Sequence, residues 1–396
     1  MTAASHVSFT NPIPGEEELV ARARAMIPML FKLAGEVEKA RRVPDSTVAA
    51  FKEAGFFHIL QPKRWGGWEM KPQVFYKVLM ELARGCPSSA WVMMALGVHQ
   101  WEFGLFPQQA GNDVWAKDRT VLIASSYAPV GKSERVDGGW RISGRWPASS
   151  GTDHANWAIL GGLKMQDGKP IDRLAMLVPR ESYTIDDDWY VFGLCGTGSK
   201  SLIVKDTFVP DHRTHSLLDT QRTGNAAPCY KPQFTLVFWG AVSSVINGMA
   251  QGAVDIFTDL MKTRINAATG VATNTNPYVR DRLANAVAKV RSSRMRLLSV
   301  MNNALEHALR GNAVPMDEFV PAVLDITRVG HECEEAVLLL YKATAAQGLF
   351  LNTPLQRILR DALAGANHIT QNADDMAGNL GGYLLGQPLP PLVYGR

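Results

Sequence analysis

The chain has 396 residues, 46% of them hydrophobic, and a formal net charge of +4 with an isoelectric point near 8.8. Its basic and acidic residues are interspersed, so nothing in the charge pattern points to nucleic acid. Four cysteines lie far apart with no C-x-x-C pair, which argues against a zinc site or a disulfide framework and fits reduced thiols in a cytoplasm.

The first part of the chain, from about Glu16 to Trp115, is predicted to be helical. Apolar residues recur there at helical spacing along one face, at Leu19, Met26, Leu30, Leu33 and Val37. A second helix is expected to open around Pro44 and to end at Gly55, and another to span 72–84 after a turn-rich loop at 62–67. Residues 1–15 lack the basic segment and apolar run of a signal peptide, so we expect none.

The middle of the chain, from about Thr120 to Val209, has a different pattern. Short alternating runs such as Leu202-Ile-Val are bounded by Gly and Asp, and Asp137-Gly138-Gly139 predicts a hairpin. We interpret this part as a small antiparallel β domain followed by a polar linker over 210–232. His212 and His215 in this linker are expected to lie in a solvated loop and not to bind metal.

From about Phe234 onward the sequence predicts a bundle of four long helices, over 235–266, 276–311, 318–348 and 354–385. The most apolar stretch, 238–257, contains Ser243, Asn247 and Gln251, so it is read as a buried core helix and not as a membrane span. The predicted domains are 1–118, 119–225 and 226–396. A parallel nucleotide-binding sheet would instead need alternating strands and helices.

This three-part order resembles the acyl-CoA dehydrogenase fold, an α+β architecture of an N-terminal helical domain, a middle antiparallel β domain and a C-terminal four-helix bundle. The stretch Gly193-Leu-Cys-Gly-Thr-Gly-Ser-Lys is similar to the matching segment of that superfamily. Several further segments are similar to its flavin-dependent monooxygenase branch, which includes hydroxylases of 4-hydroxyphenylacetate and of a secosteroid phenol. They are Arg42-Val-Pro-Asp, Gln61-Pro-Lys-Arg-Trp-Gly-Gly67, Ser89-Ala-Trp91, Val98-His99, Ala124-Ser-Ser-Tyr-Ala-Pro129, Ser149-Ser-Gly-Thr-Asp-His154, Asp188-Trp-Tyr190, and Arg360-Asp361 with His368.

The resemblance implies the oxygenase component of a two-component monooxygenase. Reduced FMN or FAD would react with dioxygen to a C4a-hydroperoxyflavin that hydroxylates an aromatic ring. Since no NAD(P)H-binding motif is present, a separate reductase would supply the reduced flavin. The family is commonly a homotetramer with flavin sites shared between subunits, and no membrane association is expected.

The resemblance also assigns candidate roles to residues. Ser150, after Ser149, matches a serine near flavin N5; without the resemblance, both would be read as part of an ordinary turn. Ser125, Ser126 and Tyr127 match a strand edge that contacts flavin and substrate, although Ser and Tyr are also common in strands.

Two histidines match family positions with different roles. His99 matches a residue that faces a substrate phenol, where a neutral imidazole can accept a proton while Ser125 holds the same oxygen. A lone histidine in this apolar stretch is otherwise a hydrogen-bonded core residue. His368, placed by the pattern in the last helix, matches a histidine that favours hydroperoxide formation, and Leu363 stands where relatives carry another histidine.

Further residues match positions that bind the flavin. Arg264, at a helix end, matches a ligand of the flavin phosphate, and could otherwise be a solvated helix-end cation. Flavin-lining positions are matched by Trp91, Ala346, Gln347 and Ile369. Phe234 stands near the place of an arginine beside the flavin in the hydroxyphenylacetate enzyme, which leaves Lys231 as a weak substitute.

Two alternatives use the same fold. An acyl-CoA dehydrogenase needs a carboxylate base at the flavin, yet no glutamate follows Glu335, and helix 235–266 offers only Asp255 and Asp259. A non-enzymatic binding protein would not need His99, Ser125, Ser150 and His368 together. A steroid-derived phenol, a simple phenol and an indole all remain open as the small-molecule substrate.

Overall fold

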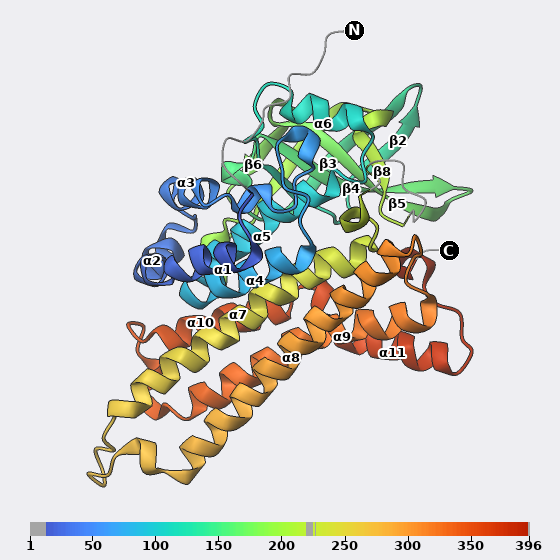
Figure 1. The fold of residues 1–396 in the computed structure, drawn as a ribbon. Coiled ribbons are helices and arrows are strands. Elements are labelled where there is room, and N and C mark those ends of the chain that lie inside the picture. Colours follow the sequence, from blue (N-terminus) through green and yellow to red (C-terminus); the bar gives the residue numbers. More distant parts are fainter. Residues whose placement is uncertain (1–12, 219–224, 226, 395–396) are drawn as a thin grey trace.

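The computed structural model describes residues 13–218, 225 and 227–394, and its chain order is helices, two sheets, helices (Figure 1). The N-terminal helices are α1 (Glu16–Ala25), α2 (Ile27–Ala40), α3 (Asp45–Glu53), α4 (Pro72–Gly85), α5 (Pro87–Glu102) and α6 (Gln108–Trp115). The apolar face that predicted one helix is divided at Met26, because Pro28 lies in the first turn of α2. Gly55 follows α3 with φ of 80°, a left-handed conformation that glycine adopts without strain.

The middle strands form two four-stranded sheets, in the orders β1-β4-β5-β8 and β2-β3-β7-β6. They are β1 (Ile123–Ser126), β2 (Lys132–Val136), β3 (Gly139–Ser149), β4 (Trp157–Gln166), β5 (Lys169–Pro179), β6 (Tyr183–Asp186), β7 (Lys200–Pro210) and β8 (Thr214–Ser216). The predicted hairpin at Asp137–Gly138 joins β2 to β3. The expectation of purely antiparallel strands was wrong in one place: β1 pairs with β4 in parallel.

The first of these sheets is buried on both faces. Along β4, Ala158 and Leu160 face the core between the two sheets, while Ile159 packs on the other side with Phe103 and Trp115 from the N-terminal helices. β1 therefore lies where the helical and β parts of the chain meet.

The predicted linker over 210–232 was wrong in its first part. Residues 211–213 form a 3-10 turn, and β8 follows, pairing with β5. Its central residues, 219–224 and 226, lie outside the described ranges.

The C-terminal helices are α7 (Phe234–Thr263), α8 (Pro277–Leu309), α9 (Met316–Lys342), α10 (Pro354–Ala366), α11 (Ala373–Leu384) and α12 (Pro391–Tyr394). The fourth predicted helix, 354–385, was wrong: residues 367–372 interrupt it with a short 3-10 turn, and Asn372 caps α11 by accepting from the N–H of Asp375. α7 lies at the centre, packed against α4, α5, α8, α9 and α10.

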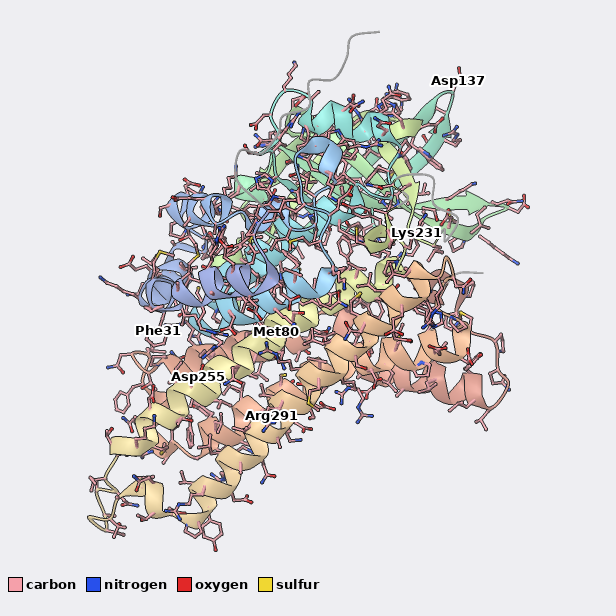
Figure 2. All side chains as sticks on the ribbon, viewed as in Figure 1. Phe31, Met80, Asp137, Lys231, Asp255 and Arg291 are labelled. Carbon is pink, nitrogen blue, oxygen red and sulfur yellow. The ribbon has the colours of Figure 1, made fainter. Side chains whose placement is uncertain are left out.

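The burial of α7 agrees with the prediction for residues 238–257, and within the described ranges no helix is long and apolar enough to cross a membrane. Asn247 donates to the carbonyl of Val290 on α8 at 2.9 Å, as a buried amide requires. Figure 2 shows Asp137 at the hairpin tip and Lys231 where the chain enters α7.

Candidate active site

A cavity of about 450 Å³ lies between α5, β1, β3, the start of α7 and the link between α10 and α11. Its walls are mainly apolar with a few convergent polar groups, which is typical of small-molecule sites. Of the residues singled out from the sequence, those that line it are Trp91, His99, Ser125, Ser126, Tyr127, Ser150, Phe234, His368 and Ile369. Ser149, Arg264, Ala346 and Gln347 do not line this cavity.

His99 and Ser125 form a hydrogen-bonded pair on one wall. His99 Nδ1 lies 2.8 Å from the carbonyl oxygen of Ile123, and Nε2 lies 2.8 Å from Ser125 Oγ. Because a carbonyl only accepts, Nδ1 carries the hydrogen, and burial lowers the pKa of His99, which favours the neutral ring. Nε2 is then an acceptor for the Ser125 hydroxyl, whose oxygen keeps a lone pair for a ligand.

Ser150 lies on the neighbouring wall at the end of a chain of hydroxyls. Thr197 Oγ1 donates to the carbonyl of Leu194 at 2.8 Å, so it must accept from Ser199 Oγ, 2.7 Å away. Ser199 in turn must accept from Ser150 Oγ, also at 2.7 Å, while Ser150 accepts from the indole N–H of Trp91 at 3.1 Å. The hydroxyl hydrogen of Ser150 is therefore donated to Ser199, so Ser150 can only accept a hydrogen bond from a group in the cavity.

A β-bulge places Ser150 against the cavity. The pairing of β3 with β7 shifts between Trp146 and Ser149, and Ala148 takes a φ of 58° there. Bulges commonly re-aim side chains beside functional sites. Ser126 Oγ donates to the carbonyl of Pro147 at 2.5 Å and holds the bulge to β1.

Ser149, the residue before Ser150, does not line the cavity. It is fully buried, and its hydroxyl has no hydrogen-bond partner among the described residues.

The Asp153–His154 turn after Ser150 is held from two sides. Asp153 accepts from Lys200 on β7 at 2.9 Å, and His154 Nδ1 lies 3.1 Å from Asp45 of α3. The two residues therefore bind the turn to different elements and do not pair with each other.

His368 lies in the interruption between α10 and α11, not within a helix as predicted. Its Nδ1 accepts from the N–H of Thr370 at 3.3 Å, so the neutral ring carries its hydrogen on Nε2. Burial lowers the pKa of His368 to about 4. The ring packs edge-on against Trp91 with centroids 5.5 Å apart, which brings it into the wall that holds Ser150.

Arg264, Ala346 and Gln347 lie far from the cavity of their own chain. Arg264 follows the C-terminal end of α7, whereas Phe234 at the N-terminal end lines the cavity. The 30-residue helix between them is about 45 Å long. Residues 345–349 follow α9 at the same end of the bundle as Arg264, as the course of α7 and α9 in Figure 1 shows.

The cation that lines the cavity is Arg173 on β5, which the sequence did not single out. Burial lowers the pKa of its guanidinium, and no acidic side chain pairs with it among the described residues. Lys231 is exposed and does not line the cavity. Phe234 lies there, stacked on Phe238 with centroids 4.0 Å apart.

Sequence reasoning also missed Glu102 and misplaced His215. Glu102 is fully buried at the end of α5, Tyr127 Oη donates to it, and His215 Nε2 lies 2.8 Å from its Oε1. His215 is therefore not in a solvated loop, and His212 is paired with Asp113 at 2.8 Å. The three-residue spacing from His99 to Glu102, one helical turn, was the only available signal.

These groups fit a reduced flavin. The acceptor at Ser150 and the donor at His368 suit a flat heterocycle that carries both N–H and C=O groups, and Trp91 lies between them. No carboxylate lines the cavity in the described part of the chain: Asp255 pairs with Arg84 at 2.8 Å, and Asp259 pairs with Lys262. The base that an acyl-CoA dehydrogenase needs is absent from these walls.

Comparisons with known proteins agree with the fold described above. Residues 14–109 match the family model "Acyl-CoA dehydrogenase, N-terminal domain", and residues 241–373 match "Acyl-CoA dehydrogenase, C-terminal domain". The oxygenase subunit HsaA of a flavin-dependent monooxygenase from Rhodococcus jostii is 40% identical, covering 89% of this chain and 94% of that protein. The oxygenase component of p-hydroxyphenylacetate 3-hydroxylase from Acinetobacter baumannii is 30% identical, covering 95% and 91%.

Solved structures are similar over most of the chain. The crystal structure of 3-HSA hydroxylase from Rhodococcus sp. RHA1 superposes with a TM-score of 0.90 at 38% identity, covering 94% of this chain and 98% of that one. XiaF from Streptomyces sp., in complex with FADH2 and glycerol, gives a TM-score of 0.86 at 27% identity, covering 94% and 96%.

Proposed function

This chain belongs to the acyl-CoA dehydrogenase family, among the oxygenase subunits of flavin-dependent monooxygenases, and we propose that it hydroxylates a phenolic ring held against Ser125 and His99. It is the oxygenase component of a two-component system, so a separate reductase provides the reduced flavin. When bound, reduced flavin would activate dioxygen, one atom of which enters the ring.

The proposal rests on the direction of the hydrogen bond between Ser125 and His99, in which the serine hydroxyl donates and the ring nitrogen Nε2 accepts. A phenol hydroxyl can donate to Ser125 Oγ while Ser125 donates to His99 Nε2, which is free to accept a proton. Moving the phenol proton toward His99 leaves a phenolate, whose ortho carbon is the better nucleophile. The apolar wall of Phe234, Phe238 and Trp239 excludes water from this exchange.

Ser150 and His368 would hold the flavin. Ser150 offers an acceptor to the ring N–H at N5, because its own proton is committed to Ser199. His368, neutral at physiological pH, offers its Nε2–H to a flavin oxygen. Arg173 gives the same cavity one positive charge, which suits an anionic flavin or the carboxylate of an acidic substrate.

The flavin site is completed by a second copy of the chain in a homotetramer. Arg264 and Gln347, which match flavin-binding positions, lie at the far end of α7 and α9, where they cannot reach the cavity of their own chain. Large apolar side chains are exposed at both places, which supports contact between copies. Those at the far end are Ile265, Leu349, Phe350 and Leu351; at the cavity it is Ile369.

A phenol and its methyl ether, in which a methyl group replaces the hydroxyl hydrogen, together test the substrate class. Given a flavin reductase, NADH and air, the protein is expected to hydroxylate a phenol and to leave its methyl ether unreacted. Equal hydroxylation of the ether would show that proton transfer to Ser125 and His99 is not part of the reaction.

A further inference from the structure

Behind the cavity wall lies a buried acid that none of the roles above uses. Glu102 ends α5, one helical turn after His99, and is fully buried. Tyr127, whose ring lines the cavity, donates its hydroxyl to Glu102 Oε2. His215 on β8 reaches the other oxygen, Oε1, at 2.8 Å, and its side chain is only 7% exposed.

The hydrogen bonds of His215 fix the charge of this pair. Its Nδ1 lies 2.9 Å from the carbonyl oxygen of Ser216, so Nδ1 carries a hydrogen. Its Nε2 faces a carboxyl oxygen, and a neutral ring has no second hydrogen to give. The hydrogen between Nε2 and Oε1 therefore belongs either to His215, giving an imidazolium beside a carboxylate, or to Glu102, giving a neutral imidazole beside a carboxylic acid. In both arrangements the pair has a net charge of zero.

Among the described residues, His215 is the basic side chain that pairs directly with Glu102. No lysine or arginine pairs with Glu102 among the described residues, and the ring of His215 packs edge-on against Phe106 with centroids 4.4 Å apart. Glu102 is close to the catalytic wall, because Tyr127, which donates to it, packs against His99 with ring centroids 6.0 Å apart. The other ionisable groups around the pair are Tyr127, Asp172 and Arg173, with Asp172 held by Ser216 Oγ at 2.7 Å.

We propose that Glu102 and His215 are positioning residues that form a neutral buried pair, fixing Tyr127 at the cavity wall and allowing a phenolic ligand to ionise at Ser125 and His99. The proposal rests on the function proposed above. A bare carboxylate behind Tyr127 would repel a phenolate and oppose its formation. His215 cancels that charge without touching the ligand. Glu102 can therefore hold Tyr127 in place without opposing the ionisation of the phenolic ligand.

The test uses the protein without flavin, so that it does not depend on turnover. 4-Nitrophenol is titrated into the protein, and the ratio of phenolate to phenol in the bound ligand is read from its visible absorbance at fixed pH. His215→Gln is expected to lower this ratio about tenfold, because it leaves Glu102 uncompensated. His212→Gln, which changes a histidine of the same segment paired with Asp113, is the matched control and is expected to leave the ratio unchanged.

Glu102→Gln provides a second reading that does not require the His215 variant to fold. Its amide keeps an acceptor for Tyr127 and a donor for the neutral His215 ring, so the ratio is expected to stay within about twofold of the wild type. A tenfold rise in Glu102→Gln, or an unchanged ratio in a folded His215→Gln, would overturn the neutral pair while leaving the phenol site intact. Failure of the wild type to bind the ligand would overturn the phenol site and the role of the pair together.

Discussion

Ser125 Oγ lies 2.8 Å from His99 Nε2, while the opposite ring nitrogen, Nδ1, lies 2.8 Å from the carbonyl oxygen of Ile123. The two contacts fix the tautomer of the ring, because the carbonyl can only accept. Both partners of His99 belong to β1, so one short strand sets the orientation of the ring and also supplies the hydroxyl between the ring and the cavity.

Replacing His99 with Ala should slow ring hydroxylation by about a hundredfold or more, the usual contribution of a positioned general base. Reduced flavin should still be oxidised, with hydrogen peroxide released in place of product. Product and peroxide are measured in the same reaction by chromatography and a peroxidase assay. His331→Ala, which changes an exposed histidine of α9, is the control. Hydroxylation at the wild-type rate in the His99 variant would exclude this role.

Replacing Ser199 with Ala should raise hydrogen peroxide release roughly severalfold per reduced flavin, although Ser199 is not among the residues that line the cavity. The change removes the acceptor that commits the proton of Ser150, so Ser150 is free to point its hydrogen at the flavin. Ser150→Ala should give a similar rise. Thr197→Ser keeps the hydroxyl of the chain and should keep wild-type coupling. If Ser199→Ala remained fully coupled, the orientation of Ser150 would have another cause.

Two variants that are inactive alone should regain hydroxylation activity when their subunits are mixed. If His99 and Arg264 act in the same site from different chains, some sites in a mixed tetramer of His99→Ala and Arg264→Ala contain both native residues. The variants are unfolded and refolded together, and hydroxylation is compared with each variant refolded alone. Recovery of activity only in the mixture is expected. A mixture no more active than its parts, with both variants still assembling, would place the two residues in separate sites.

His368 should make the folded state less stable in acid. Because burial lowers its pKa from 6.5 to about 4, the folded chain favours the neutral ring. The stability that this preference gives the fold is fully present above the pKa of His368 in the unfolded chain, 6.5. It is lost as the pH falls through the pKa of His368 in the folded chain, about 4. Denaturant unfolding at about pH 7 and pH 4 should therefore show a smaller loss of stability in His368→Gln than in the wild type. Equal losses in the two proteins would mean that His368 is not held neutral.

The order of the elements followed from the sequence, because hydrophobic periodicity changes from helical to alternating and back. The same reasoning failed at His368, since residues 354–385 keep a helix-like pattern and the interruption at 367–372 depends on packing against Trp91 and α9. The local signal for the break, the capping Asn372 ahead of Asp374 and Asp375, is weaker than the helix-like pattern on both sides of it.

The site was predicted only in part, for a related reason. His99, Ser125 and Ser150 were found through a resemblance, and the structure brings them to one cavity. Glu102 and His215 are 113 positions apart, so nothing in the sequence joins them, and a short polar segment containing His215 was read as solvated. Arg264 was matched to a flavin-binding position through the resemblance, and it lies at the end of α7 opposite the cavity of its own chain, so this role stays a prediction.

Isotopically labelled dioxygen tests the central claim most directly. The protein is given a flavin reductase, NADH, FMN or FAD, and a panel of phenols with an indole, and the products are examined by mass spectrometry. One labelled oxygen atom in a ring hydroxyl of at least one phenol is the expected result, together with its loss in His99→Ala. If every phenol is recovered unchanged while all the reduced flavin is reoxidised with dioxygen reduced to hydrogen peroxide, the cavity is not a hydroxylation site for phenols.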